Sequence, residues 1–184
     1  PGTKHRVRLE ITSRPDNLRS VDHSKSANMH YSTLEIHNTM GNFLVALQFA
    51  LLLVLAALAA PKVVRGDISV AAFVLAGACL VLAVWTLAHN RPGNFNIRPV
   101  PKAHGHLITT GPYRWIRHPM YTSVLLGAAA LAWTSSPLVG WTTWLTLAAV
   151  LFVKSTLEER WMHEKHGGYA AYRLSSKRFL PWLF

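Results

Sequence analysis

The sequence predicts an all-α, polytopic membrane protein with about four transmembrane helices. Hydrophobic residues make up 51% of the 184 residues and charged residues only 15%, an unusual balance for a soluble domain. Asp, Glu, Lys and Arg are absent from three long stretches, residues 36–61, 68–90 and 118–153. Such runs are typical of helices that cross a bilayer.

The first two stretches each predict one spanning helix. Residues 42–60 and 68–88 are dominated by Leu, Ala, Val and Phe and have no polar face at helical spacing. Each is close to the roughly 20 residues that a helix needs to cross the hydrocarbon core. Cys79, the one cysteine of the chain, lies in the second helix, so an internal disulfide is excluded.

The third stretch is too long for a single span and predicts a helical hairpin. The turn formers Thr134–Pro137 interrupt it. We therefore expect helices at about 119–133 and 138–153. Both arms are short for a full crossing, so we expect them to continue beyond the hydrocarbon.

Basic residues predict the orientation of the chain. Of the 19 Lys and Arg residues, 17 fall in residues 1–40, 89–118 and 154–184, and two fall in the 61–67 loop. Four spans place the first three segments on one side, which the positive-inside pattern predicts to be the cytoplasm, together with both termini. Anionic lipid headgroups account for the net charge of +11, and no nucleic-acid partner is expected.

Domain organisation is predicted to be simple. Residues 1–40 are polar and lack apolar periodicity, so we expect a flexible N-terminal tail without a cleavable signal peptide. Residues 41–184 are predicted to form a single integral membrane domain, with segments 89–118 and 154–184 in the cytoplasm. The sequence carries no signal for the oligomeric state.

The first candidate site lies at the end of the 89–118 segment, which is rich in Pro, Gly and His. Pro119 suits the first turn of a helix, so Arg117 and His118 are predicted at a helix N-terminus near the membrane surface. A carboxylate or phosphate fits there. Alternatively, these two side chains only contact lipid headgroups, and the residues alone leave both readings open.

A second candidate site begins where the last span leaves the membrane. Helical spacing places Lys154 and Glu158 one above the other, with Leu157 and Trp161 beside them as an apolar edge. The adjacent carboxylates of Glu158 and Glu159 suit an ammonium group, or they form an ordinary solvated helix end. The pairs His104/His106 and His163/His166 lack a third ligand nearby, so no metal site is predicted.

These motifs together resemble a known enzyme family. The motifs are Leu107-Ile108, Gly111-Pro112-Tyr113, Arg117-His118-Pro119-Met120-Tyr121, Glu158-Glu159, Gly167-Gly168-Tyr169 and Tyr172. Over residues 89–184 the chain resembles the isoprenylcysteine carboxyl methyltransferases, whose wider relatives are the phospholipid methyltransferases. The combination is much more specific than any of its parts.

The resemblance implies an integral membrane enzyme that transfers a methyl group from S-adenosylmethionine to a lipophilic small-molecule or prenylated acceptor, with S-adenosylhomocysteine as product. The implied cofactor contacts are Leu107, Ile108, Tyr113, His118, Pro119, Tyr121 and Glu158. Lys154 takes the place of an arginine that lies near the substrate carboxylate in eukaryotic members. Gly105, flanked by His104 and His106, takes the place of a frequent family histidine.

Catalytic and substrate roles follow from the acceptor's chemistry. A carboxylate acceptor arrives ionised and needs a positive partner, for which Arg117, Lys154 and Arg160 are candidates. An amine acceptor needs a base, and Glu158 or Glu159 would serve. Leu157 and Trp161 are expected to guide a lipophilic chain. The alternatives are a phospholipid amine N-methyltransferase and a non-catalytic membrane binding protein of the same fold.

Overall fold

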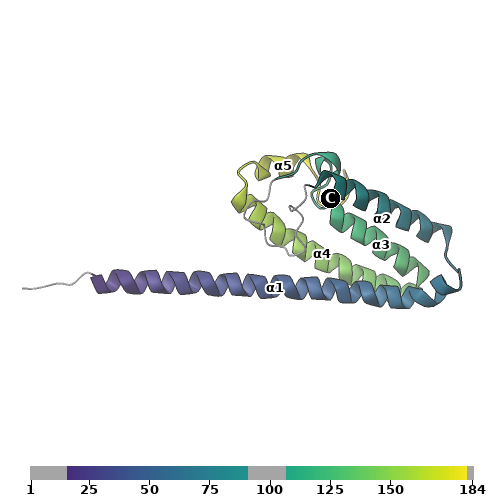
Figure 1. Cartoon of the computed structure of the whole chain (residues 1–184), viewed down its shortest axis with the longest axis horizontal. Coiled ribbons are helices and arrows are strands. Elements are labelled where there is room, and N and C mark those ends of the chain that lie inside the picture. The colour runs from purple at the N-terminus through teal and green to yellow at the C-terminus, as the bar shows by residue number, and fades with distance from the viewer. Residues whose placement is uncertain (1–15, 91–106, 182–184) are drawn as a thin grey trace, which may run out of the picture. The chain divides into compact units, whose positions relative to one another are not determined.

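The computed structural model describes residues 16–90 and 107–181, with side chains from Thr39 onward. By its contacts the chain divides into residues 1–39 and residues 40–184, and everything below concerns the second unit unless stated. All regular elements of the described part are helical, which confirms the predicted fold class (Figure 1). In order they are α1 (Asp16–Val64), α2 (Val70–His89), η1 (Gly111–Arg114), α3 (Pro119–Thr134), α4 (Pro137–Lys165) and α5 (Tyr169–Ser175).

Three helical stretches among the described residues are long and apolar enough to cross a membrane: Thr39–Val64, Val70–His89 and Pro137–Lys165. The chain is thus a multi-pass membrane protein. The fourth predicted span forms as α3, but its 16 residues extend only about 24 Å. This is less than the roughly 30 Å of the hydrocarbon core, so the helical residues of α3 by themselves are too short to cross it.

Two helices are longer than the hydropathy pattern predicts. Helix α1 begins at Asp16 rather than near residue 42, so helical backbone includes much of the segment expected to be a tail. No Gly or Pro interrupts the sequence from residue 16 to residue 40, so nothing in the backbone chemistry stops the helix there. Helix α4 continues to Lys165, as expected for an arm that extends beyond the hydrocarbon.

The α3–α4 hairpin turns tightly because Gly140 lacks a side chain. A Cβ at Gly140 would lie 2.1 Å from Ser135 Oγ and 2.7 Å from the carbonyl oxygen of Ala132. Ser135 Oγ donates a hydrogen bond to the same Ala132 carbonyl at 2.9 Å. Lys62, near the end of α1, donates from Nζ to the Ser135 carbonyl at 3.2 Å, so α1 is attached to the hairpin turn.

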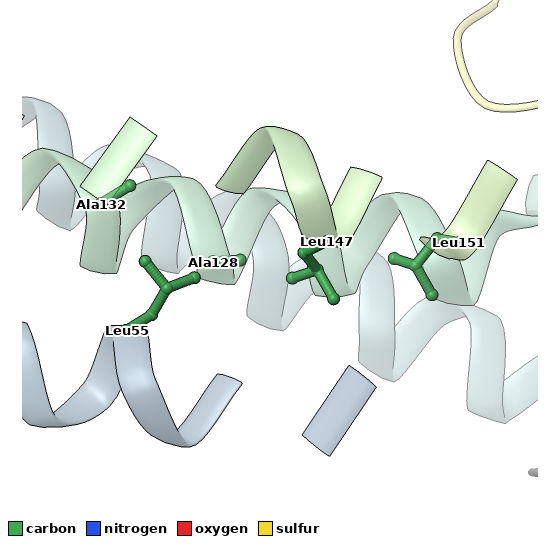
Figure 2. Packing of buried hydrophobic residues seen from close by; sticks show 5 residues of the cluster. All are labelled: Leu55, Ala128, Ala132, Leu147 and Leu151. Carbon is green, nitrogen blue, oxygen red and sulfur yellow. The ribbon is translucent and has the colours of Figure 1, made fainter. Parts of the chain in front are cut away.

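The core lies where α1, α3 and α4 meet (Figure 2). Its buried side chains are Leu55, Ala128, Ala132, Leu147 and Leu151, each at most 1% exposed. Alanines on α3 let the helix backbones approach closely, as is typical inside membranes. Helix α2 packs along α3 (Figure 1), and its outward face exposes large apolar side chains such as Phe73 and Val81. This face of α2 suits contact with lipid.

Candidate functional site

Residues 115–118, which lead into α3, are fixed by the segment that follows α5. Ile116 and Lys177 form a parallel β-bridge. The Arg117 N–H donates to the Lys177 carbonyl at 2.7 Å, and the His118 N–H donates to the Arg178 carbonyl at 3.1 Å. We call residues 176–179 the C-terminal strap. It sets the position of Arg117 and His118 immediately before Pro119 begins the helix.

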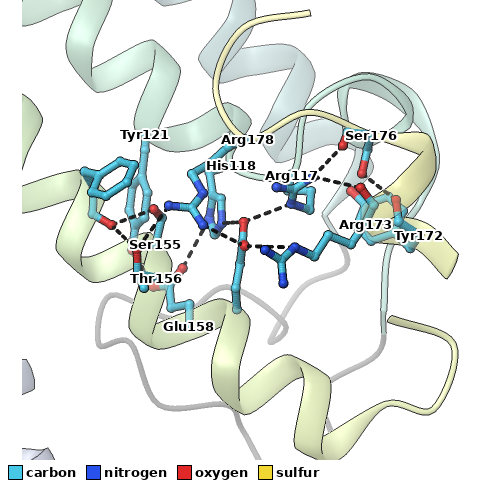
Figure 3. A network of polar contacts seen from close by, with 12 residues as sticks. Arg117, His118, Tyr121, Ser155, Thr156, Glu158, Tyr172, Arg173, Ser176 and Arg178 are labelled. Carbon is cyan, nitrogen blue, oxygen red and sulfur yellow. Dashed lines mark hydrogen bonds and ion pairs between the residues drawn. The ribbon is translucent and has the colours of Figure 1, made fainter. Parts of the chain in front are cut away.

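Glu159 is the centre of a buried ion-pair cluster, and Figure 3 labels its partners Arg117, His118, Arg173 and Arg178. Its Oε1 accepts hydrogen bonds from Arg117 Nε at 2.8 Å and from His118 Nε2 at 3.2 Å. Its Oε2 accepts a bond from Arg178 at 2.9 Å, while Arg173 Nε lies 3.9 Å away. The side chain of Glu159 is only 5% exposed. Its charge is therefore balanced by cations from three segments of the chain.

Glu158 has different surroundings from its neighbour. Its Oε1 accepts a hydrogen bond from the Tyr121 hydroxyl, and its Oε2 lies 3.4 Å from His118 Nδ1. Its side chain is 22% exposed, so this carboxylate is more open than that of Glu159. Of the two acids, Glu158 is the one that a ligand can approach.

The His118 ring lies between the two carboxylates and stacks on the Tyr121 ring, with 5.4 Å between the centroids. Burial alone disfavours charge on the imidazole, but its hydrogen bonds with Glu158 and Glu159 outweigh this and raise the pKa of His118 above its ordinary value. The imidazolium form is favoured, so both ring nitrogens donate.

Helix α1 reaches the site through Gln48. Lys154, one turn before Glu158 on α4, is 1% exposed, and its Nζ donates to Gln48 Oε1 at 2.7 Å. The same ammonium lies 5.1 Å from the centroid of the Tyr121 ring. A buried cation in a membrane-spanning helix is costly and marks a functional position.

Tyr113, in η1, lies near enough to Glu158 to be affected by its charge. Burial, followed by the charge of Glu158, raises the pKa of Tyr113 to about 12, so its hydroxyl stays protonated. Its carbonyl accepts a 2.7 Å hydrogen bond from the Tyr172 hydroxyl of α5. Gly111, with φ of 61°, lies against the His89 ring, because a Cβ there would fall 2.3 Å from His89 Cδ2. The connection before α3 is thus attached to the end of α2.

The structure brings most of the sequence candidates together. Arg117, His118, Tyr121, Glu158 and Glu159 form one network. Leu107, Ile108, Leu157 and Trp161 are half-buried, Pro119 is buried and Arg160 is exposed. His104, Gly105 and His106 lie outside the described residues.

Sequence reasoning missed Gln48, Arg178 and Ser176, whose carbonyl accepts a hydrogen bond from Arg117. Gln48 could have been identified from the sequence, since it is the one polar residue between Phe43 and Ala60. No sequence pattern distinguishes Arg178. Among the residues with described side chains, no group of three His, Cys, Asp or Glu residues could hold a metal ion.

The model of a family described as phospholipid methyltransferase matches residues 67–168. This range contains α2, α3, α4 and both acids of the network, and it ends before the C-terminal strap. No curated protein and no solved structure matches the chain.

Proposed function

Since this chain belongs to the phospholipid methyltransferase family, we propose that it transfers a methyl group from S-adenosylmethionine to a lipophilic acceptor at the cytoplasmic membrane interface, as in isoprenylcysteine carboxyl methylation. The family implies methyl transfer to lipid-related substrates, in agreement with the motif resemblance. The observation that supports the proposal most is the arrangement of one open acid, Glu158, beside His118 and Tyr121.

The donor set of the site fits S-adenosylmethionine, which carries an ammonium, a carboxylate, a sulfonium and an adenine. Glu158 offers a partly exposed carboxylate for the ammonium. Both ring nitrogens of His118 face Glu158 and Glu159, but the positive charge of the imidazole still favours a carboxylate at the start of α3, where His118 makes no side-chain cap. The ring of Tyr113 suits the sulfonium, whereas the Tyr121 ring already stacks on His118 and lies 5.1 Å from the Lys154 ammonium. Leu107, Ile108 and Pro119 add apolar surface.

When bound, S-adenosylmethionine supplies a methyl group whose bond to sulfur breaks as its bond to the acceptor forms. The residues of this chain have to align the acceptor and exclude water. Arg117 and Glu159, both catalytic candidates from the sequence, use their polar atoms on each other, on His118, on the Arg173 carbonyl of α5 and on the strap. We therefore assign them to holding His118 in place, and we assign contact with the reactants to His118, Glu158 and Lys154.

Two acceptor classes are supported by different residues. Lys154, held in the protein interior by Gln48, is a positive partner for an ionised carboxylate, which favours carboxyl methylation. Glu158, the more open acid, can remove a proton from an amine, which favours phospholipid amine N-methylation as the second candidate. We favour carboxyl methylation over amine methylation, because a buried charge such as that of Lys154 is energetically costly and usually has a function.

The acceptor reaches the site from the bilayer in this proposal. A lipid chain loses about 0.8 kcal/mol of hydrophobic burial for each methylene that leaves the membrane. Leu157 and Trp161 lie half-buried on α4, on either side of Glu158 in sequence, and form the edge along which the chain would pass. We propose that the short helix α3 crosses the membrane as the fourth span. Four crossings place both termini and the site on the cytoplasmic side, in agreement with the distribution of basic residues.

The deciding experiment incubates the purified protein in detergent with methyl-labelled S-adenosylmethionine and three acceptors: a prenylcysteine, phosphatidylethanolamine and a lipophilic thiol. We expect a base-labile methyl ester on the prenylcysteine. Base-stable label on the amine lipid would establish the second candidate. Glu158→Gln should strongly reduce transfer, while Glu164→Gln, the same change at an exposed position on the same helix, should retain it. If the folded wild type shows no transfer and no cofactor binding, the result would indicate a non-catalytic binding protein.

A further inference from the structure

Arg178 contacts the site through both its backbone and its side chain (Figure 3). Its carbonyl accepts the His118 N–H at 3.1 Å. Its guanidinium donates to Glu159 Oε2 at 2.9 Å and to Thr156 Oγ1 at 3.0 Å, and it lies 4.8 Å from the centroid of the Phe152 ring. The side chain is only 13% exposed. A solvated surface arginine would not have this many fixed contacts.

The planar guanidinium of Arg178 helps to fix Glu159, because the two carboxylate oxygens of Glu159 have different partners. Arg117 and His118 both use Oε1, while Arg178 takes Oε2. With both oxygens held, the carboxylate cannot rotate away from the imidazole. Thr156 and Glu159 lie one turn apart on α4, so a planar guanidinium that binds both is fixed in direction as well as in distance.

We propose that Arg178 is a positioning residue of the methyl-transfer site, which holds Glu159 and His118 so that the imidazole presents a fixed face beside Glu158. The inference rests on the proposed function. It extends the site beyond residue 168, where the family match ends, into the C-terminal strap. In this arrangement Arg178 touches neither the cofactor nor the acceptor.

Charge balance distinguishes this role from simple support of the fold. The titratable groups that face His118 are Glu158 and Glu159 from α4 and Tyr121 from α3, and the uncharged Phe179 ring of the strap lies 5.9 Å from it. Arg117 and Arg178 offset the charge of Glu159. Loss of the Arg178 charge would leave Glu159 more negative and bind the imidazolium more tightly, so His118 would titrate at higher pH. A collapsed site would separate His118 from the acids and move its titration down toward the ordinary value.

The test uses the full chain in detergent with labelled histidine, and the His118 resonance is assigned by its absence in a His118→Asn variant. In Arg178→Met we expect the titration midpoint of His118 to rise by about half a unit or more. We also expect the affinity for S-adenosylhomocysteine to fall about tenfold. Arg178→Lys should keep most of that affinity, because it retains the charge.

Arg173→Met is the matched control. Arg173 approaches the same carboxylate at 3.9 Å but is 56% exposed, so solvent screens it and both readouts should stay near wild type. An unchanged or lowered midpoint in folded Arg178→Met, with wild-type affinity, would overturn the inference.

If Arg178→Met does not fold, Thr156→Val removes only the second contact of the guanidinium. We then expect a roughly threefold loss of affinity, and full affinity would count against the inference. A raised midpoint in Arg178→Met, combined with a wild type that binds no S-adenosylhomocysteine, would instead refute the proposed function and leave the positioning of His118 by Arg178 supported.

Discussion

Glu158 and Glu159 are adjacent in the chain, yet they face opposite nitrogens of one imidazole. Glu158 lies 3.4 Å from His118 Nδ1, and Glu159 lies 3.2 Å from His118 Nε2. The first acid is partly open, and the second is enclosed by arginines. Two residues that look equivalent in the sequence should therefore respond differently to the same substitution.

Glu159→Gln should destabilise the protein, whereas Glu158→Gln should not. Removing the Glu159 charge leaves Arg117 and Arg178 buried without their counterion, a change that typically costs about 3–5 kcal/mol. Glu158→Gln should instead weaken S-adenosylhomocysteine binding about tenfold to hundredfold, because it removes a charged hydrogen-bond partner. Unfolding of both variants in mixed micelles, together with calorimetry, measures the two effects. Equal stability losses would contradict the division of roles.

The stability of the fold should decrease as pH rises above neutral. The pKa of His118 is raised in the folded protein, because the acids on either side outweigh the effect of burial. A raised folded-state pKa contributes stability that is fully present below the unfolded value of about 6.5 and is lost as pH rises through the folded value. Unfolding measured from pH 5 to 9 should show this loss in the wild type and not in His118→Asn. Parallel curves for the two proteins would rule out His118 as the cause.

Gln48→Leu should impair the acceptor step and spare cofactor binding. The change removes the 2.7 Å hydrogen bond that fixes the Lys154 ammonium. A hydrogen bond to a charged group contributes about 1.5–3 kcal/mol, so the KM for a carboxylate acceptor should rise roughly tenfold or more. Affinity for S-adenosylhomocysteine should stay within about twofold. Loss of cofactor affinity to the same degree would place Lys154 on the cofactor side of the site.

The sequence predicts a helix boundary where neighbouring residues indicate it, and it does not predict one where they do not. The start of α3 was predictable because Pro119 suits the first turn of a helix. The start of α4 was predicted within one residue from the turn formers Thr134–Pro137, and Pro137 itself belongs to the helix. The start of α1 was not, because residues 16–40 have no apolar periodicity to indicate a helix. A polar segment without Gly or Pro is compatible with either state.

The site shows the same division. Arg117 and His118 were found because they precede a helix-starting proline, and Glu158 and Glu159 because they follow a span. Gln48 contacts Lys154 across 106 residues, and Arg178 contacts Glu159 across 19 residues and a turn of the chain. Neither contact leaves a periodic trace, since both depend on how helices and strap pack. Long-range partners of this kind become visible only in the folded structure.

Topology can be tested with two single cysteines in a Cys79→Ala background. Val64 is 86% exposed at the end of α1, and Gly167 follows α4 with open space around the position of a Cβ, so cysteine fits at both. The positive-inside pattern places Gly167 in the cytoplasm and Val64 on the opposite side. An impermeant thiol reagent added to intact cells should label Val64→Cys alone. Labelling of both from one face would contradict the proposed orientation.

Access of the acceptor from the bilayer gives the last prediction. Leu157 and Trp161 are half-buried on α4 beside Glu158. A charge at Leu157 should obstruct the passage of a long apolar chain while leaving the cofactor contacts in place. Leu157→Lys should therefore raise the KM for a long-chain acceptor at least about tenfold, with nearly unchanged affinity for S-adenosylhomocysteine. Leu174→Lys, at a position on α5 that is 91% exposed, is the matched control and should behave like wild type.

The length of the acceptor chain tests the same route in the wild type. Each methylene removed from the acceptor should weaken its apparent affinity by up to about 0.8 kcal/mol. A chainless, water-soluble analogue methylated as efficiently as its long-chain parent, in detergent and in bilayers alike, would show that the membrane only anchors the protein.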